Sequence, residues 1–466
     1  MARTDTLGHF LTDVADAIRN KKGSSGTIQA SSFDTEIASI PSGGSGEAIK
    51  SNDVNFYDYD GTILHSYTKS EFNNLQAMPD NPTHEGLTSM GWNWTFQEAK
   101  DYMTTHNFLE IGQVYQPSDA SIVIYVSLDE FSLNPYISFS IKGTATIDWG
   151  DNTTPDTITG TSVSTVINTP HTYSSAGDYV IKITSTSDIR LQAGNTSIGS
   201  KFFWGGSNDD YSTNVKYIRS IEKIFFNNNV VLINNYTFCY CNNLKNIILP
   251  NNATVLGNNL FYSCFNLKHI TIPKQNNYSL VNYLFYSCYS LKSISLSSTT
   301  QKIGQNTFQY CYALNRITMP NNLTTFSANM FQYSYITELE IPNNATNYST
   351  SCFASLQYVD KIVINNTSDI ILNGSAFNSC SSRQFIVKGN ITSIAGGAFY
   401  NASACLKYDF TGCTSVPPLA NVSAFYKINA NCKIIVPDSL YEDWIIETNW
   451  SDLASYIVKA SDYNEE

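Results

Sequence analysis

The stretch NLFYSCFNLKHITIP, residues 259–273, recurs along the second half of the chain. Its phenylalanine, Phe261, belongs to a series in which one phenylalanine follows the previous one after 22 to 24 residues. The series comprises Phe238, Phe261, Phe285, Phe308, Phe331, Phe353, Phe377 and Phe399. A constant period of this length indicates a solenoid, in which each repeat forms one coil and buries its apolar face against its neighbours.

Other positions keep a fixed distance from this phenylalanine. A cysteine stands three residues after it at Cys241, Cys264, Cys288, Cys311 and Cys380. The segment LKHITIP predicts a short strand that ends at Pro273. Ser334, Leu356 and Ala402 replace the cysteine in later repeats, so distorted or terminal repeats are expected there.

All ten cysteines lie between Cys239 and Cys432, and their spacing follows the repeat. The pattern therefore predicts buried, reduced thiols that stack without bonding. Cys239 and Cys241 form a CxC pair, but no cluster of histidines accompanies them, so a zinc site is not expected. We expect no metal and no cofactor.

The repeat pattern closely resembles BspA-type leucine-rich repeats. This resemblance implies extracellular attachment and binding. The segment CKIIVPDSLYEDWIIETNWSDLASYIVKA, residues 432–460, resembles the strand and helix that close such arrays. It implies a cap in which Trp444 and Trp450 pack on the last coil.

An aromatic residue also recurs four residues after the phenylalanine. These positions are Phe265, Tyr289, Tyr312 and Tyr335. The favoured interpretation of an aromatic ladder with the period of the solenoid is a half-buried spine between turn and strand. The alternative is a binding surface for sugar rings or for a protein.

Two motifs mark residues 129–192, where the sequence alternates as strands do. DWGD at residues 148–151 and HTY at residues 171–173 resemble the signatures of a PKD domain, an immunoglobulin-like β-sandwich. The resemblance implies a spacer or adhesion module. Trp149 and Tyr173 are expected in its core, with the acidic residues shaping a turn and not performing catalysis.

The segment VNFYDYDGT, residues 54–62, resembles the first motif of haloacid-dehalogenase phosphatases, in which Asp58 would be the nucleophile and Asp60 the general acid. Too little chain follows for that fold, so a hairpin turn is the favoured prediction. Thr95 and Glu98 predict a helix with a capping box. Trp92 and Trp94 before it are expected in the core, a sugar platform being the alternative.

Residues 5–41 resemble a segment found at the front of structural proteins of phages and prophages, which implies a role in a virion. Its first amphipathic helix carries Leu7, Phe10, Leu11, Val14 and Ile18. So short a helix needs a partner. Docking onto another virion protein is favoured, because a glycine-rich linker follows at 41–46, while packing on the next domain and self-trimerisation stay open.

The composition excludes several classes of function. The net charge is −12 and charged residues make up only 14% of the chain, so no nucleic-acid partner is expected. No apolar run approaches the length of a membrane span and the start shows no signal peptide, so we expect no membrane insertion and synthesis in the host cytoplasm.

These observations predict a mainly β multidomain protein. The expected parts are a helical attachment segment with its linker (1–46), a small α+β module (47–128), a PKD-like sandwich (129–192), a leucine-rich-repeat solenoid (193–425) and a C-terminal cap (426–466). The function predicted is that of a non-enzymatic phage virion protein of fibre, tail or decoration type. Its N-terminus would bind other virion proteins and its repeats a glycan or protein of the host surface, with homo-oligomerisation left open. A structural spacer within the virion and a bacterial surface adhesin are the alternatives.

Overall fold

A computed structural model describes residues 53–191, 202–204, 216–253, 255–274, 280–300, 302–366 and 368–464. The chain divides into two units, Met1–Ser51 and Asn52–Glu466, and all described residues belong to the second unit. The attachment residues expected at Leu7, Phe10, Leu11, Val14 and Ile18 lie outside the described residues, so that part of the account stays a prediction.

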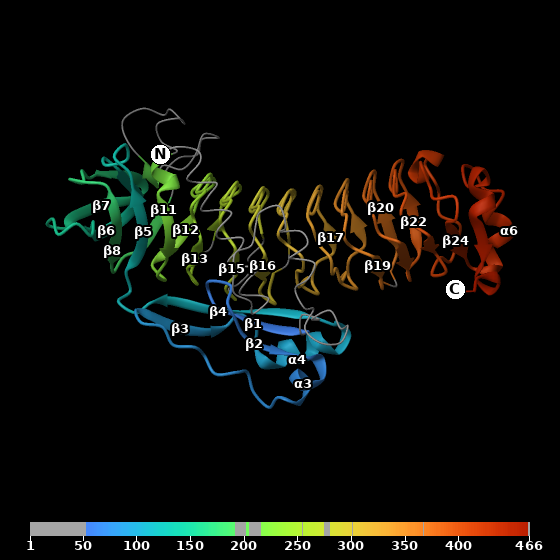
Figure 1. Ribbon diagram of the computed structural model, residues 1–466, viewed down its shortest axis with the longest axis horizontal. Helices are drawn as coiled ribbons and strands as arrows, with labels where there is room; N and C mark the ends of the chain where they lie inside the picture. Colours follow the sequence, from blue (N-terminus) through green and yellow to red (C-terminus); the bar gives the residue numbers. More distant parts are fainter. Residues whose placement is uncertain are drawn as a thin grey trace, which may run out of the picture. The chain divides into compact units, whose positions relative to one another are not determined.

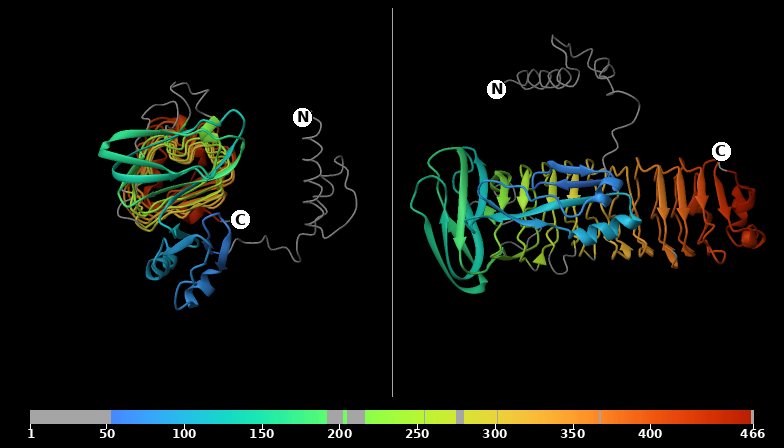
Figure 2. Two further views of the ribbon diagram at one scale, coloured as in Figure 1. Left: turned by 90° about the vertical axis from the view of Figure 1, so that its left-hand side faces the viewer. Right: turned by 90° about the horizontal axis from the view of Figure 1, so that it is seen from below.

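Most of the second unit is a β-solenoid of stacked parallel strands, as the period predicted (Figure 1). Seen end on, the coils superpose (Figure 2). The strand that follows the phenylalanine builds what we call the front sheet: β13 (Asn246–Ile248), β15 (His269–Thr271), β16 (Ser293–Ser295), β19 (Lys361–Ile364), β21 (Gln384–Val387), β23 (Lys407–Asp409), β24 (Lys433–Val436) and β25 (Ile457–Lys459). A second row contains β14 (Val255–Leu256), β17 (Thr325–Phe326), β18 (Asn347–Tyr348), β20 (Ile370–Leu372) and β22 (Ile391–Ile394).

The repeated phenylalanines form a continuous stack along the axis of the solenoid. All eight are buried, and the ring centroids of successive members lie 5.4 to 5.8 Å apart. Phe425 extends the stack beyond Phe399 at 5.3 Å. No single coil covers its own phenylalanine, so the apolar core exists only where coils are adjacent.

The cysteine column is buried and its thiols are free, as expected. Cys264 donates its thiol hydrogen to the carbonyl oxygen of Phe238, at 3.1 Å. Ser334 donates to the carbonyl of Phe308 in the same way, at 2.7 Å, so the replacement does not distort the coil. Burial raises the pKa of Cys380 to about 12, so this thiol is protonated and unreactive at neutral pH.

Each coil turns through two residues with left-handed backbone, two positions before and two after the phenylalanine. In the coil of Phe261 these are Asn259, with φ of 57°, and Ser263, with φ of 59°. Asparagine tolerates this conformation better than most residues do, which accounts for part of the asparagine content of the repeats.

At the far end of the array, Trp444 and Trp450 are fully buried, as expected. Trp450 packs 5.6 Å from Phe425 and donates its indole N–H to the carbonyl of Pro417 at 2.8 Å. The helical turns in this part of the chain are η2 (Val422–Phe425), η3 (Asp438–Leu440), α6 (Tyr441–Trp444), η4 (Ser451–Tyr456) and η5 (Ala460–Asp462).

At the near end, a ten-stranded sheet continues into the solenoid. It joins β5 (Ile122–Leu128), β6 (Tyr136–Asp148), β7 (Asp156–Pro170), β8 (Gly177–Ser185), β9 (Ile189–Leu191) and β10 (Phe203–Trp204) to β11 (Ile221–Phe225), β12 (Val230–Ile233), β13 and β14. Because β5 pairs with β8 and β11, and β9 with β12, the sheet crosses the boundaries expected after residues 128 and 192.

Trp149 and Tyr173 lie in the core of this region, as expected, with 1% and 2% of their surface exposed. The Tyr173 hydroxyl donates to the carbonyl of Trp149 at 2.9 Å. Asp148 accepts the backbone N–H of Gly150, and Asp151 accepts that of Thr153, so both carboxylates shape the turn.

The small module forms a separate four-stranded sheet in the order β2 (Ile63–Tyr67), β1 (Val54–Tyr57), β4 (Leu109–Pro117) and β3 (Leu87–Trp92). Its helices are α3 (Lys69–Asn74) and α4 (Phe96–Thr105). The capping box of Thr95 and Glu98 is present. The expected hairpin is also confirmed, because β1 and β2 pair antiparallel around Gly61, whose φ is +88°.

This module packs against the front sheet (Figures 1 and 2). Asn93 and Trp94 donate side-chain N–H groups to the carbonyls of Ile272 and Leu296, at 3.1 and 2.8 Å. Tyr102 donates its hydroxyl to the carbonyl of Met319 at 3.1 Å. The three carbonyls occupy the same position, eleven residues after the phenylalanine, in three successive coils. The module therefore follows the period of the solenoid.

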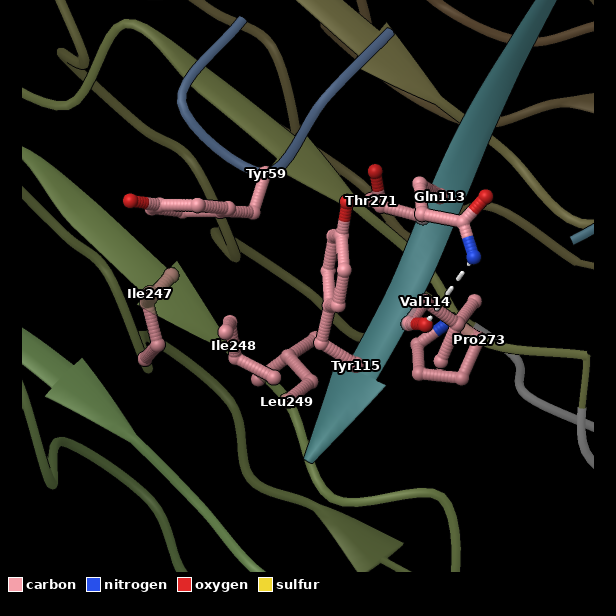
Figure 3. Close-up of a pocket in the computed structure, with 9 residues that line it drawn as sticks. All are labelled: Tyr59, Gln113, Val114, Tyr115, Ile247, Ile248, Leu249, Thr271 and Pro273. Carbon is pink, nitrogen blue, oxygen red and sulfur yellow. Dashed lines mark hydrogen bonds between the residues drawn. The ribbon is translucent and has the colours of Figure 1, made fainter. Parts of the chain in front are cut away.

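A buried ion pair and close packing complete this contact. Glu110 of β4 pairs with Arg316, and both side chains are less than a tenth exposed. Nearer the start of the array, Tyr115 lies against Ile248 and Leu249 (Figure 3). The cavity left there measures about 10 Å³, room for roughly one water molecule.

The phenylalanine stack predicts a large penalty for a single truncation. Phe308→Ala is expected to lower the free energy of unfolding by about 3–5 kcal/mol, because it opens a cavity between two coils. Phe131→Ala is the matched control: its side chain is 76% exposed, so a change within about 0.5 kcal/mol is expected. Equal urea midpoints for the two variants would contradict the stack as the core of the array.

His269 predicts an acid sensitivity of the contact between module and solenoid. Burial lowers its pKa to about 3, against the opposing effect of Asp60, and its ring stacks on Tyr57 at 5.0 Å. The unfolded chain binds a proton at His269 below about pH 6.5 and the folded chain does not, so acidification favours unfolding. Between about pH 6.5 and 4.5 this histidine alone is expected to remove about 2–3 kcal/mol of stability.

The comparison variant is His269→Gln, which keeps polar contacts but does not titrate. Urea unfolding of both proteins at neutral and acidic pH isolates the contribution of this one side chain. We expect a shallower loss of stability with acid in the variant. The same pH slope in both proteins would show that His269 is solvated and that the module is not docked.

Candidate functional site

The predicted aromatic ladder is exposed on the surface of the array. Tyr289, Tyr312 and Tyr335 expose 42%, 38% and 41% of their surface, while Phe265 is half-buried. Successive ring centroids lie 4.7, 5.3 and 5.2 Å apart. Tyr358, 54% exposed, extends the ladder at 4.9 Å from Tyr335. It was missed because it stands five residues after its phenylalanine instead of four.

A second row of aromatic side chains runs beside the first. It consists of Tyr240, Tyr262, Tyr286, Tyr310 and Tyr333. Neighbouring centroids lie 4.6 to 5.6 Å apart, and the two rows meet where Tyr310 lies 6.2 Å from Tyr312. We call the two rows, with Phe265 and Tyr358, the tyrosine ridge. The second row was not predicted because its spacing from the phenylalanine is one residue in some coils and two in others.

The chemistry of the ridge follows from the way the rings stack. Several successive rings face each other, with interplanar angles of 3° between Phe265 and Tyr289 and 26° between Tyr289 and Tyr312. Ring edges and hydroxyls are therefore the parts that a partner reaches most easily. Partial burial and neighbouring tyrosines raise the pKa of Tyr286 and Tyr312, so these phenols stay neutral. Each neutral hydroxyl both donates and accepts hydrogen bonds.

Asp58, the residue that resembles a phosphatase nucleophile, is already engaged. It is 4% exposed. One carboxylate oxygen accepts the backbone N–H of Tyr59 and the Tyr115 hydroxyl, both at 2.8 Å, and the other lies 2.7 Å from Nε2 of His84. These contacts tie the β1–β2 hairpin to β4, and they leave the carboxylate no open approach for a substrate.

The remaining candidates have structural roles. Trp94 is 4% exposed and lies in the core of the small module, and the partly buried Trp92 packs against that core, 4.9 Å from Phe56. Among the described residues, no cluster of three His, Cys, Asp or Glu side chains is placed to hold a metal ion. In the same part of the chain, no helix has the length and apolar character required to cross a membrane.

Comparison with known proteins identifies the repeats. Residues 211–334 and 278–406 match the family described as BspA type leucine rich repeat region, in six copies. No curated protein matches the chain. Among solved structures, a leucine rich cell surface protein from Faecalibacterium prausnitzii A2-165 matches with 17% identity and a TM-score of 0.24, over 51% of this chain and 83% of that one. Residues 211–406 of the solenoid are thus similar to BspA-type leucine-rich repeats.

Proposed function

We propose that this protein is a non-enzymatic surface adhesion protein that binds its partner through the tyrosine ridge. The observation that carries the proposal is the exposure of Tyr289, Tyr312 and Tyr335 in one continuous row of neighbouring rings. Tyrosine is enriched where proteins bind partners, because it combines apolar area with a hydrogen-bonding group. The engagement of Asp58 supports the non-enzymatic part of the proposal.

The chemistry of the ridge favours a glycan as the partner. Within each row its tyrosine hydroxyls recur once per coil, so a ligand that itself repeats can satisfy several of them in the same way. A neutral polysaccharide offers such a row of hydroxyls. A protein of the target surface is the second possible partner, and it would need to match the ridge by shape.

We propose a bacterial cell surface as the place where the protein acts, because BspA-type repeats imply extracellular attachment. A phage virion is the second candidate, favoured by the resemblance of residues 5–41 to phage structural proteins. In that case Leu7, Phe10, Leu11, Val14 and Ile18 would contact other virion proteins. Homo-oligomerisation fits either location.

The flanking regions fit a supporting role. We propose that residues 129–192 form a PKD-like spacer, in line with the buried Trp149 and Tyr173. We also propose that residues 426–466 cap the array, since Trp444 and Trp450 cover the last phenylalanine of the stack. An open end of a solenoid would expose strand edges to aggregation.

Two triple variants of the full chain test the ridge. Changing Tyr289, Tyr312 and Tyr335 to Ala removes both rings and hydroxyls, and is expected to weaken binding to purified bacterial envelopes by roughly tenfold or more. Changing the same residues to Phe keeps the stack and removes only the hydroxyls, so a smaller loss is expected. The control is Phe131→Ala with Ile446→Ala, two side chains about three-quarters exposed outside the ridge.

Binding is measured by sedimentation with envelopes and, in parallel, with purified phage particles. Envelope binding that survives the alanine variant would remove the ridge as the binding surface. Binding by the ridge to virion components alone would contradict adhesion and favour a structural spacer.

A further inference from the structure

The front sheet is covered by the small module over only part of its length. Asn107 of the module still contacts Glu340 through its backbone N–H at 2.9 Å. In the described part of the chain, no hydrogen bond or ion pair joins the module to the later front strands β19, β21 and β24. The front sheet thus has a covered part and an open part.

One column of side chains runs through both parts. Strand pairing places His269 beside Ser293 and Arg316 beside Glu338 in the covered part. The same position, seven or eight residues after the phenylalanine, continues in the open part as Lys361, Gln384, Lys407 and, by pairing with Lys407, Lys433. In a chain with a net charge of −12, this open part is a local concentration of cations.

The covered part shows which chemical group this column accepts. Arg316 is paired with the carboxylate of Glu110, which the small module inserts against the sheet, and its other side reaches Glu338 at 3.4 Å. Arg316 has 7% of its side chain exposed, so the carboxylate compensates a buried charge. Among the described residues, no ion pair joins a carboxylate of the module to Lys361 or Lys433.

A cavity of about 820 Å³ lies over the open part. Arg383, Lys407 and Lys433 line it together with Asp360 and Asp462. This volume falls within the range of ligand pockets, roughly 300–1,000 Å³. It is far too large for a single ion.

The walls of the cavity combine charge with neutral hydrogen-bonding groups. Lys407 is only 8% exposed, and its ammonium lies 5.0 Å from the ring centre of Tyr463. Arg383 and Lys433 are exposed, and no ion pair joins either one to a described acidic side chain. Gln384 and Asn431 add amide groups, which suit hydroxyls.

We propose that this cavity is a second binding site, which takes a short acidic oligosaccharide through its carboxylates. Arg383 and Lys433 bind the carboxylates, Gln384 and Asn431 bind hydroxyls, and Tyr463 offers an aromatic ring to the sugar. The site stands independently of the tyrosine ridge, because it lies on the front sheet and uses charge where the ridge uses neutral phenols.

Fluorescently labelled oligogalacturonate, a chain of uronic acids, is the probe for the full-length protein. We expect saturable binding that Arg383→Gln with Lys433→Gln weakens by roughly tenfold, since a carboxylate loses both charged partners. Lys142→Gln with Lys302→Gln is the control, which removes the same charge from exposed positions outside the cavity and leaves binding unchanged. The methyl-esterified oligomer, which is neutral, is expected not to bind.

Three results would overturn the proposal. Equal loss of binding in both double variants would show attraction by net charge alone. Binding of an oligoglutamate of the same charge with equal affinity would show an acidic-peptide site in place of a saccharide site. Absence of any binding by oligogalacturonate at low salt, where charge attraction is strongest, would also exclude it.

Discussion

Every other feature of this protein depends on the contact between one coil and the next. A coil buries its phenylalanine only against the phenylalanines of its neighbours, at 5.3 to 5.8 Å, and its cysteine or serine bonds to a carbonyl of an earlier coil. This contact fixes the spacing between coils. The same spacing then brings the exposed tyrosines into a stack and aligns the carbonyls that the small module binds.

The placement of the small module decides which surfaces remain for partners. The front sheet would otherwise present His269, Thr271, Ser295 and Arg316 to solvent, but the module buries them. Gly112 of β4 lies so close to the sheet that a side chain there would collide with Thr271 and Ser295. The two surfaces that we propose for recognition, the tyrosine ridge and the open end of the front sheet, differ in their chemistry.

The solenoid could be predicted because its information is periodic. Phe261, Cys264 and Ile270 recur at a fixed distance, and any repeat with that spacing must stack. The docking of the module onto the solenoid could not be predicted. Tyr102 in helix α4 and Trp94 just before this helix look like residues of the module's own core. Nothing in the sequence says that their polar atoms bond to coils about 200 residues away.

Periodicity also decides how far the two proposed binding surfaces, the tyrosine ridge and the cavity, could be predicted. The first tyrosine row keeps one spacing and was visible, whereas the second row shifts by one residue between coils. The cavity joins Arg383 to Tyr463, which are far apart in the chain and share no motif. Only the fold brings such residues together.

Hydroxyl-radical footprinting of the free, full-length protein tests the central claim, that the module covers the front sheet and leaves the ridge open. The account predicts rapid oxidation of Tyr289, Tyr312 and Tyr335, and strong protection of Trp94 and Tyr102, which expose 4% and 2% of their surface. Protection of the three ridge tyrosines, together with oxidation of Trp94 and Tyr102, would contradict it.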